Sequence, residues 1–181
     1  AAAGLGVLRA SVACGGRGAD VDQHGDRCHQ RTTAASSRHG ELSVFVLLMA
    51  PEEAEFFAGR LGIGEQYRVV TSEAGLRDAV ENGAVRLISF CQELIVPPPI
   101  LLGLKGQCFN FHPGPPELPG RHPALRALEG RSTTFGVTFH TMAEKVDTGP
   151  IHAVRRFALQ VPSSIHEIEI LAYRASLELV A

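Results

Sequence analysis

Two polar side chains stand two residues apart at the end of an apolar run, in the stretch "CFNFHPGPP" at 108–116. The run is typical of a strand, and the Pro-Gly-Pro segment ends it. Because residues two apart on a strand point the same way, Asn110 and His112 are expected to face one side of a sheet edge. Such residues often only cap backbone groups. The two side chains can also be working members of a catalytic site, and this stretch alone leaves both interpretations open.

A second polar cluster occurs in "HTMAEKVDTGPI" at 140–151. A strand is predicted to end near His140, and the loop that follows carries Asp147. An Asp in a Thr-Gly loop can be only a turn former. Its carboxylate can also orient and charge a histidine. The catalytic interpretation requires Asp147 and His112 to lie on neighbouring loops over the same sheet edge.

The elements that must position these residues alternate between apolar runs and helix-length segments. This alternation predicts right-handed crossovers and an α/β fold, a Rossmann-like, mainly parallel sheet with flanking helices. Open sheets of this kind bind ligands at the carboxyl ends of their strands, where Asn110 and His112 stand. The predicted strands are 42–50, 66–72, 85–90, 107–111, 133–142 and 151–161, and the predicted helices are 51–61, 72–83, 122–130 and a last one beginning near 164.

Helix-end signals support these boundaries. Pro51 suits a first helical turn, Ser72 can cap the second helix and Gly83 can stop it. Ser164 and Glu167 form a capping box before the last helix. An apolar stripe on that helix is predicted to be core: Ile168, Leu171, Ala172, Ala175 and Leu179.

Composition limits the classes of function. The chain has 181 residues, 45% of them apolar, and a net charge of -2, so one core is expected and neither nucleic acid nor an anionic membrane is an expected partner. No apolar run approaches the roughly 20 residues of a membrane span. The four cysteines suggest no disulfide framework, which favours the cytoplasm. The oligomeric state stays open.

The first 40 residues differ from the rest. They are rich in Ala, Gly, Ser, Arg and His without apolar periodicity, which predicts a disordered or non-native leader at 1–40 and a catalytic domain at 41–181. The helical pattern persists to the last residue, so the domain can be truncated there. A metal site is not expected, because the leader's Cys and His residues match no common zinc spacing. These residues are Cys14, His24, Cys28 and His29.

The stretches "FNFHPGPPELPGRHPALRAL" and "GVTFHTMAEKVDTGPI" together resemble the formyltransferases that use 10-formyltetrahydrofolate. This family includes glycinamide ribonucleotide, methionyl-tRNA and sugar-amine formyltransferases and formyltetrahydrofolate hydrolases. Its signature is Asn-x-His-Pro at a strand end and an Asp-x-Gly loop later in the chain. Asn110, His112 and Asp147 match this signature, and the resemblance covers roughly 42–181. It implies a formyltransferase-type fold and a one-carbon transferase.

The resemblance also implies a reaction, in which an amine attacks the formyl carbon of 10-formyltetrahydrofolate directly. Asn110 would stabilise the oxyanion of the tetrahedral intermediate. His112 would take the proton from the amine and pass it to the departing folate nitrogen, while Asp147 would hold and charge the imidazole.

By the same resemblance, segments 90–97 and 144–149 would build the folate pocket, largely through backbone groups. The implied folate-binding residues are Gln92, Leu94, Ile95, Glu144, Val146, Thr148 and Gly149. Weaker candidates for contacts with the acceptor are Arg121, His122 and His140.

The acceptor is open beyond a small-molecule amine. Ribonucleotide-using relatives have a Gly-rich loop after the first strand that cradles a phosphate, whereas this chain has the acidic "MAPEEAEFF", which argues against a phosphorylated glycinamide. Two alternatives to a transferase remain: a formyltetrahydrofolate hydrolase, in which water is the acceptor, and a non-catalytic folate-binding remnant.

Overall fold

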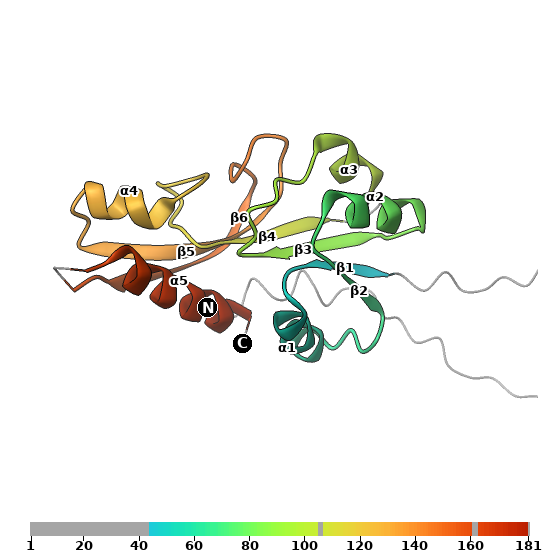
Figure 1. The fold of residues 1–181 in the computed structure, drawn as a ribbon, viewed down its shortest axis with the longest axis horizontal. Coiled ribbons are helices and arrows are strands. Elements are labelled where there is room, and N and C mark those ends of the chain that lie inside the picture. Colours follow the sequence, from blue (N-terminus) through green and yellow to red (C-terminus); the bar gives the residue numbers. More distant parts are fainter. Residues whose placement is uncertain (1–43, 105–106, 161–162, 181) are drawn as a thin grey trace, which may run out of the picture.

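The fold is described by a computed structural model over residues 44–104, 107–160 and 163–180. The leader predicted at 1–40 lies outside the described residues, so the predicted domain division stays a prediction. The described part is an α/β fold with one mixed sheet, as the alternation of segments predicts (Figure 1).

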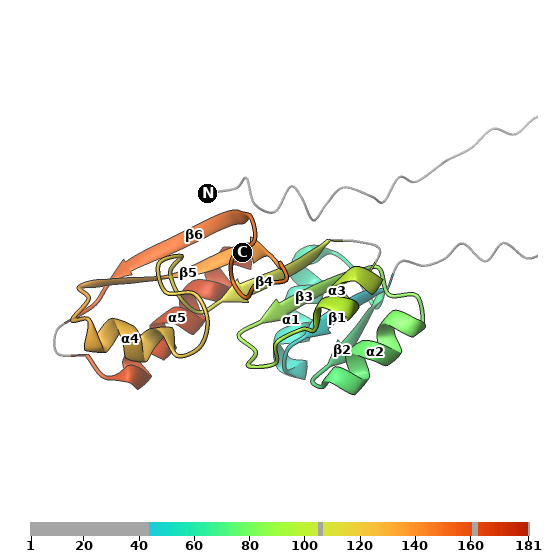
Figure 2. The same ribbon diagram turned by 90° about the horizontal axis from the view of Figure 1, so that it is seen from above.

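The sheet has six strands in the order β2-β1-β3-β4-β5-β6. The first four strands in this order are parallel; β5 then pairs antiparallel with β4, and β6 pairs antiparallel with β5. Figure 2 shows this as a long sheet in which β5 and β6 extend to one side of the parallel part. The predicted mainly parallel sheet is confirmed, and its last two strands pair antiparallel. The strands are β1 (Phe45–Leu48), β2 (Tyr67–Val70), β3 (Arg86–Phe90), β4 (Cys108–His112), β5 (Thr134–Thr141) and β6 (Ile151–Ala158).

The helices begin where the end signals place them. Pro51 occupies the first turn of α1, the Ser72 hydroxyl accepts from the Gly75 N–H at the start of α2, and Ser164 and Glu167 form the predicted capping box. The short helix α3 was not predicted, although its leading prolines are a start signal. The helices are α1 (Pro51–Leu61), α2 (Glu73–Glu81), α3 (Pro98–Gly103), α4 (Pro123–Glu129) and α5 (Ile165–Val180).

Helices cover both faces of the sheet (Figure 1). Helices α2 and α3 pack on one face with aliphatic residues of β1 and β3, while α1 and the end of α5 pack on the other over a cluster rich in phenylalanine. In that cluster Phe57 meets Phe90 and Phe111 edge to face, and Phe111 stacks on Phe139. Because side chains pack on both faces of the sheet, the position of β4 is fixed. This strand carries Asn110 and His112. None of the described helices has the length and apolarity needed to cross a bilayer.

The prediction that Leu171 belongs to the core is wrong. Leu171 is 39% exposed, whereas Ile168, Ala172 and Ala175 of the same stripe are buried. The helix is rotated so that its buried face continues through Ser176 and Val180, which lie on the same side as Ala172. Leu171 falls on the flank of this face, because at about 100° per residue it lies well to one side of Ala172 and Ser176.

Candidate active site

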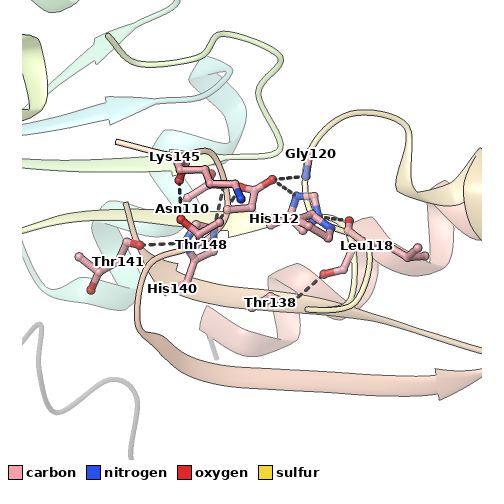
Figure 3. A network of polar contacts seen from close by, with 12 residues as sticks. Asn110, His112, Leu118, Gly120, Thr138, His140, Thr141, Lys145 and Thr148 are labelled. Atoms are coloured by element: carbon pink, nitrogen blue, oxygen red, sulfur yellow. Dashed lines mark hydrogen bonds and ion pairs between the residues drawn. The ribbon is translucent and has the colours of Figure 1, made fainter. Parts of the chain in front are cut away.

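The site is built on the paired ends of β4 and β5. Along β4 the phenylalanines point to the aromatic core, and the alternate residues Asn110 and His112 share the opposite face. The antiparallel register sets Asn110 opposite His140 and His112 opposite Thr138. Four polar side chains from two strands therefore gather on one face of the sheet, and Figure 3 shows them side by side.

Asp147 enters this group from the loop after β5. Its Oδ2 lies 3.2 Å from His112 Nδ1 and accepts from the Gly120 N–H at 2.7 Å. Its Oδ1 accepts from Asn110 Nδ2 at 3.2 Å and lies 3.3 Å from His140 Nε2. The residue has φ +54, a left-handed conformation that Asp tolerates better than most residues. The two polar clusters of the sequence therefore meet in one hydrogen-bonded group, although Asn110 and Asp147 are 37 positions apart.

Charge on Asp147 is stabilised by these donors. Burial works to raise the pKa of the carboxyl, but the bond with His140, the charge of His112 and the Gly120 N–H outweigh it and hold the pKa at about 2. The side chain is only 8% exposed, so solvent screens these contacts weakly. Asp147 is therefore a carboxylate at neutral pH, held rigidly against the imidazole of His112.

His112 lies between two acceptors. Nδ1 faces Asp147, and Nε2 lies 3.0 Å from the Leu118 carbonyl oxygen. A neutral ring can donate to only one of them, whereas an imidazolium satisfies both. Burial lowers the pKa of His112, and Asp147 and the Leu118 carbonyl offset this in part. The ring of His112 is therefore mainly neutral at pH 7. If it gains a proton, both of its N–H groups have an acceptor within hydrogen-bond reach.

The segment 113–120 closes over His112. Arg126 donates from Nη2 to the carbonyls of Leu118 and Pro119, and the Thr138 hydroxyl donates to the Gly114 carbonyl at 2.8 Å. Gly114 leaves room for the imidazole, because a Cβ there would stand 2.5 Å from His112 Nε2. The turn that ends β4 is thereby shaped around the ring.

A cavity of about 570 Å³ opens beside these side chains. Asn110, His112 and Asp147 form part of its wall, together with the segment after β3 and the loop after β5. Its volume is within the range of roughly 300–1,000 Å³ typical of small-molecule sites. Most of the residues predicted to bind folate or acceptor line this cavity: Gln92, Leu94, Ile95, Glu144, Val146, Arg121, His122 and His140.

Two predicted folate-binding residues lie elsewhere. Thr148 and Gly149 line a smaller cavity of about 240 Å³ on the other side of Asp147. The Thr148 hydroxyl donates to the Lys145 carbonyl, which closes the turn. A Cβ at Gly149 would stand 1.8 Å from the Thr141 carbonyl oxygen, so glycine lets the loop pass close to β5. In this structure both residues shape the Asp147 loop and do not face the large cavity.

Sequence reasoning missed several groups that complete the site. The Gly120 N–H, the Leu118 carbonyl and the guanidinium of Arg126 hold Asp147, His112 and the segment 113–120 in place. Gly120 has φ +82, and the Leu-Pro-Gly turn that contains it was the available signal. Backbone partners such as Leu118 carry no signal in their side chains.

Comparisons relate this chain to known proteins. A family model described as formyl transferase matches residues 69–169, more than half of the chain, and the matched part includes Asn110, His112 and Asp147. The chain belongs to the formyl transferase family. It is 32% identical over 77 residues to a methionyl-tRNA formyltransferase of Sorangium cellulosum (strain So ce56). The alignment covers 42% of this chain and 25% of that protein, so this family member spans about a quarter of its relative's length.

Solved structures share the fold. The phosphoribosylglycinamide formyltransferase of Streptococcus pneumoniae TIGR4 superposes with a TM-score of 0.58 at 20% identity, over 76% of this chain and 94% of that one. HypX of Aquifex aeolicus, in complex with tetrahydrofolic acid, superposes with a TM-score of 0.55 at 18% identity, over 75% of this chain and 26% of that one. The predicted formyltransferase-type fold is confirmed.

Proposed function

We propose that this protein transfers a formyl group from 10-formyltetrahydrofolate to a small amine, and that Asn110, His112 and Asp147 carry the reaction. One observation supports this most strongly. An amide donor, an imidazole and a carboxylate stand in a continuous set of contacts of 3.2 Å at the wall of a ligand-sized cavity. Formyl transfer to an amine needs an oxyanion donor and a proton carrier at one carbon, and these side chains supply both.

His112 is the proton carrier in this proposal. The neutral ring bonds one acceptor through its N–H, and the attacking amine supplies a second proton to the other nitrogen. The imidazolium then donates to Asp147 and to the Leu118 carbonyl together, since both are acceptors within hydrogen-bond reach. The ring returns the proton to the leaving nitrogen of the folate and becomes neutral again, so the cycle is balanced.

Asn110 and Asp147 stabilise the charges that develop during the reaction. Nitrogen Nδ2 of Asn110 has two hydrogens, and one of them donates to Asp147 Oδ1. The second hydrogen is available to the oxygen of the formyl carbon as negative charge develops there, a contribution worth about 3–4 kcal/mol for one such donor in other enzymes. Asp147 stabilises the imidazolium and keeps the ring of His112 from rotating.

The large cavity suits a folate-type donor. Leu94, Ile95 and Val146 give it an apolar wall, and the segment 91–96 offers backbone groups to a flat heterocycle. A protein of the same fold binds tetrahydrofolic acid, which supports this choice of donor. In this assignment Gln92 and Glu144 contact the donor from the rim.

The acceptor is proposed to be an amine without a phosphate. The turn after β1 leads into α1 through Glu52 and Glu53, and Glu53 accepts a hydrogen bond from the Tyr173 hydroxyl at 3.0 Å. Two carboxylates at a helix start compete with an anion for this position. Arg121, His122 and His140 remain candidates for contacts with the acceptor. Action in the cytoplasm stays a prediction from the cysteine content.

The test is a screen of amines with purified protein and 10-formyltetrahydrofolate, following release of tetrahydrofolate. We expect release that depends on one class of amine, and loss of that release in His112→Ala. The matched control is His166→Ala, which changes an exposed histidine of α5 and should leave the rate unchanged. Equal slow release by wild type and His112→Ala would overturn the assignment. Release without any amine would favour a hydrolase, and donor binding without release would favour a folate-binding remnant.

A further inference from the structure

The segment 113–120 supplies two backbone groups that bind the proposed catalytic pair, His112 and Asp147. The Leu118 carbonyl oxygen lies 3.0 Å from His112 Nε2, and the Gly120 N–H donates to Asp147 Oδ2 at 2.7 Å. Figure 3 shows Leu118 and Gly120 beside the imidazole of His112. The geometry of the pair therefore depends on how firmly this segment is held.

The segment has few backbone hydrogen bonds of its own. Four of its eight residues are proline, which has no N–H, so only four amide donors remain. The Leu118 N–H closes a turn by donating to the Pro115 carbonyl at 2.9 Å, and the Gly120 N–H is taken by Asp147. Because no regular backbone ladder can form here, side chains of neighbouring elements must hold the segment.

Apart from the catalytic pair, three side chains in the described part of the chain bind this segment. The Thr138 hydroxyl donates to the Gly114 carbonyl near the start of the segment. Arg156 pairs with Glu117 on the surface, where both side chains are at least half exposed, so this contact contributes little stability. The third side chain is Arg126, which comes from α4.

Arg126 binds the end of the segment that meets the site. Its Nη2 donates to the Leu118 carbonyl at 3.0 Å and to the Pro119 carbonyl at 2.6 Å. The Pro119 carbonyl and the Gly120 N–H belong to one planar peptide unit, so a bond that fixes the carbonyl also sets the direction of the N–H. One nitrogen of Arg126 therefore fixes both of the backbone groups that bind the catalytic pair.

The orientation of the guanidinium follows these two carbonyls. Arg126 Nε is buried and has no acceptor among the described residues, which is unfavourable for an N–H group. Hydrogen bonds from a charged donor are stronger than those between neutral groups, so the two bonds from Nη2 offset this cost. The rotamer of Arg126 is therefore set by the segment that it holds.

We propose that Arg126 is a positioning residue of the active site, which holds the Leu118 carbonyl and the Gly120 N–H where they meet the catalytic pair. Its effect on the rate rests on the proposed function, whereas the contacts themselves do not. Without the guanidinium, the peptide unit before Gly120 can rotate, and Asp147 loses a donor that holds its carboxylate against the imidazole. Misplacement of a reacting group by about 1 Å can cost on the order of a hundredfold in rate.

The first test needs no substrate. Hydrogen exchange of the Gly120 backbone amide is followed by NMR in ¹⁵N-labelled wild type, Arg126→Met and Arg126→Lys. Methionine fills the space of the arginine stem without a donor, and lysine restores a charged donor. We expect the Gly120 amide of Arg126→Met to exchange at least about tenfold faster than in wild type, measured relative to the amides of β3, and Arg126→Lys to lie between the two.

The amides of the central strand β3 report the stability of the whole fold. If the Gly120 amide exchanges at the wild-type rate in Arg126→Met, the proposal is overturned. It is also overturned if the Gly120 and β3 amides accelerate by the same factor, because Arg126 then supports the fold as a whole and does not position the segment.

The second test uses turnover. The residues that line the large cavity do not include Arg126, so its loss should act on the rate and not on the binding of the donor. We expect kcat to decrease by roughly 10–100-fold in Arg126→Met with little change in the KM for the donor, and Arg126→Lys to recover part of the loss. Arg77→Met is the matched control: this arginine pairs with Glu73 on the exposed surface of α2, and its loss should leave kcat near the wild-type value.

Equal kcat in wild type and Arg126→Met would overturn the proposal, as would a loss that lies entirely in KM. A loss in Arg126→Lys as large as that in Arg126→Met would also contradict it, because a charged donor at this place should help. If wild type turns over no amine at all, the proposed function fails, and the exchange experiment still decides whether Arg126 positions the Gly120 N–H.

Discussion

Replacement of Asp147 by asparagine tests the charge at the centre of the site. Asparagine has the same size and accepts φ +54, so the backbone is not strained by the change. The carboxylate accepts from Asn110 and the Gly120 N–H and faces His112 and His140. The amide nitrogen of Asp147→Asn must turn toward some of these donors, which removes their acceptor.

The magnitude follows from the pKa of Asp147. Its pKa is lowered from 3.8 to about 2, which at about 1.4 kcal/mol per pKa unit stabilises the folded carboxylate by about 2 kcal/mol. A carboxyl with a lowered pKa contributes this stability above pH 3.8 and loses it as the pH falls toward 2. Asp147→Asn is therefore expected to unfold about 2 kcal/mol more easily at pH 7, with a difference that shrinks below pH 4.

The assay is denaturant unfolding at pH 7 and at pH 3, beside the release of tetrahydrofolate. Turnover is expected to decrease by roughly 100–10,000-fold, the usual range for losing a general acid–base function. The matched control is Asp78→Asn, which breaks a half-exposed ion pair with Arg68 and should cost less than about 1 kcal/mol. If Asp147→Asn is as stable as wild type at pH 7 and retains its turnover, the charge reasoning is refuted.

Three further predictions concern the packing and titration of the same site. Gly114→Ala should lower turnover by at least about tenfold, because the new Cβ would meet His112 Nε2 and the structure must shift. The control Gly59→Ala, on an open helix surface, should keep the wild-type turnover. Equal rates in the two variants would contradict this packing. The pH profile of kcat/KM, corrected for protonation of the amine, should have its acid limb below pH 6.5, because burial lowers the pKa of His112 and the neutral ring takes the proton; a limb above pH 6.5 would argue against that role. Burial raises the pKa of Cys91 to about 12 and of Cys108 to about 11, so both should resist alkylation at pH 8 until the protein is unfolded, as read by peptide mass spectrometry; rapid alkylation of either in the folded state would show that it is not packed as described.

Much of the fold could be predicted because its signals are local. Strand-length apolar runs, Pro51, Ser72 and the Ser164–Glu167 capping box each identify an element from neighbouring residues. The exposure of Leu171 could not be predicted, since an apolar stripe does not say which flank of a helix the sheet covers. That choice depends on how α5 packs against β5 and β6, which are separate segments of the chain.

The individual side chains of the candidate site could be predicted from the sequence, but most of the contacts between them could not. Period-two spacing predicts that Asn110 and His112 share a face, and the strand pattern at 133–142 also places Thr138 and His140 on one face. The register that sets His140 opposite Asn110 is a property of the paired strands, and it cannot be read from either strand alone. The same holds for the Gly120 N–H, which reaches Asp147 only because the segment 113–120 folds back.

The central claim is that the formyl group moves to an amine and that His112 carries the proton. The most direct measurement follows a ¹³C-formyl label on the folate donor by NMR, with the amine identified by the screen. The account predicts that the label appears in an N-formyl product at the rate at which tetrahydrofolate forms, and that His112→Ala forms none. Label recovered as formate, or left on the donor while folate binds, would contradict the account.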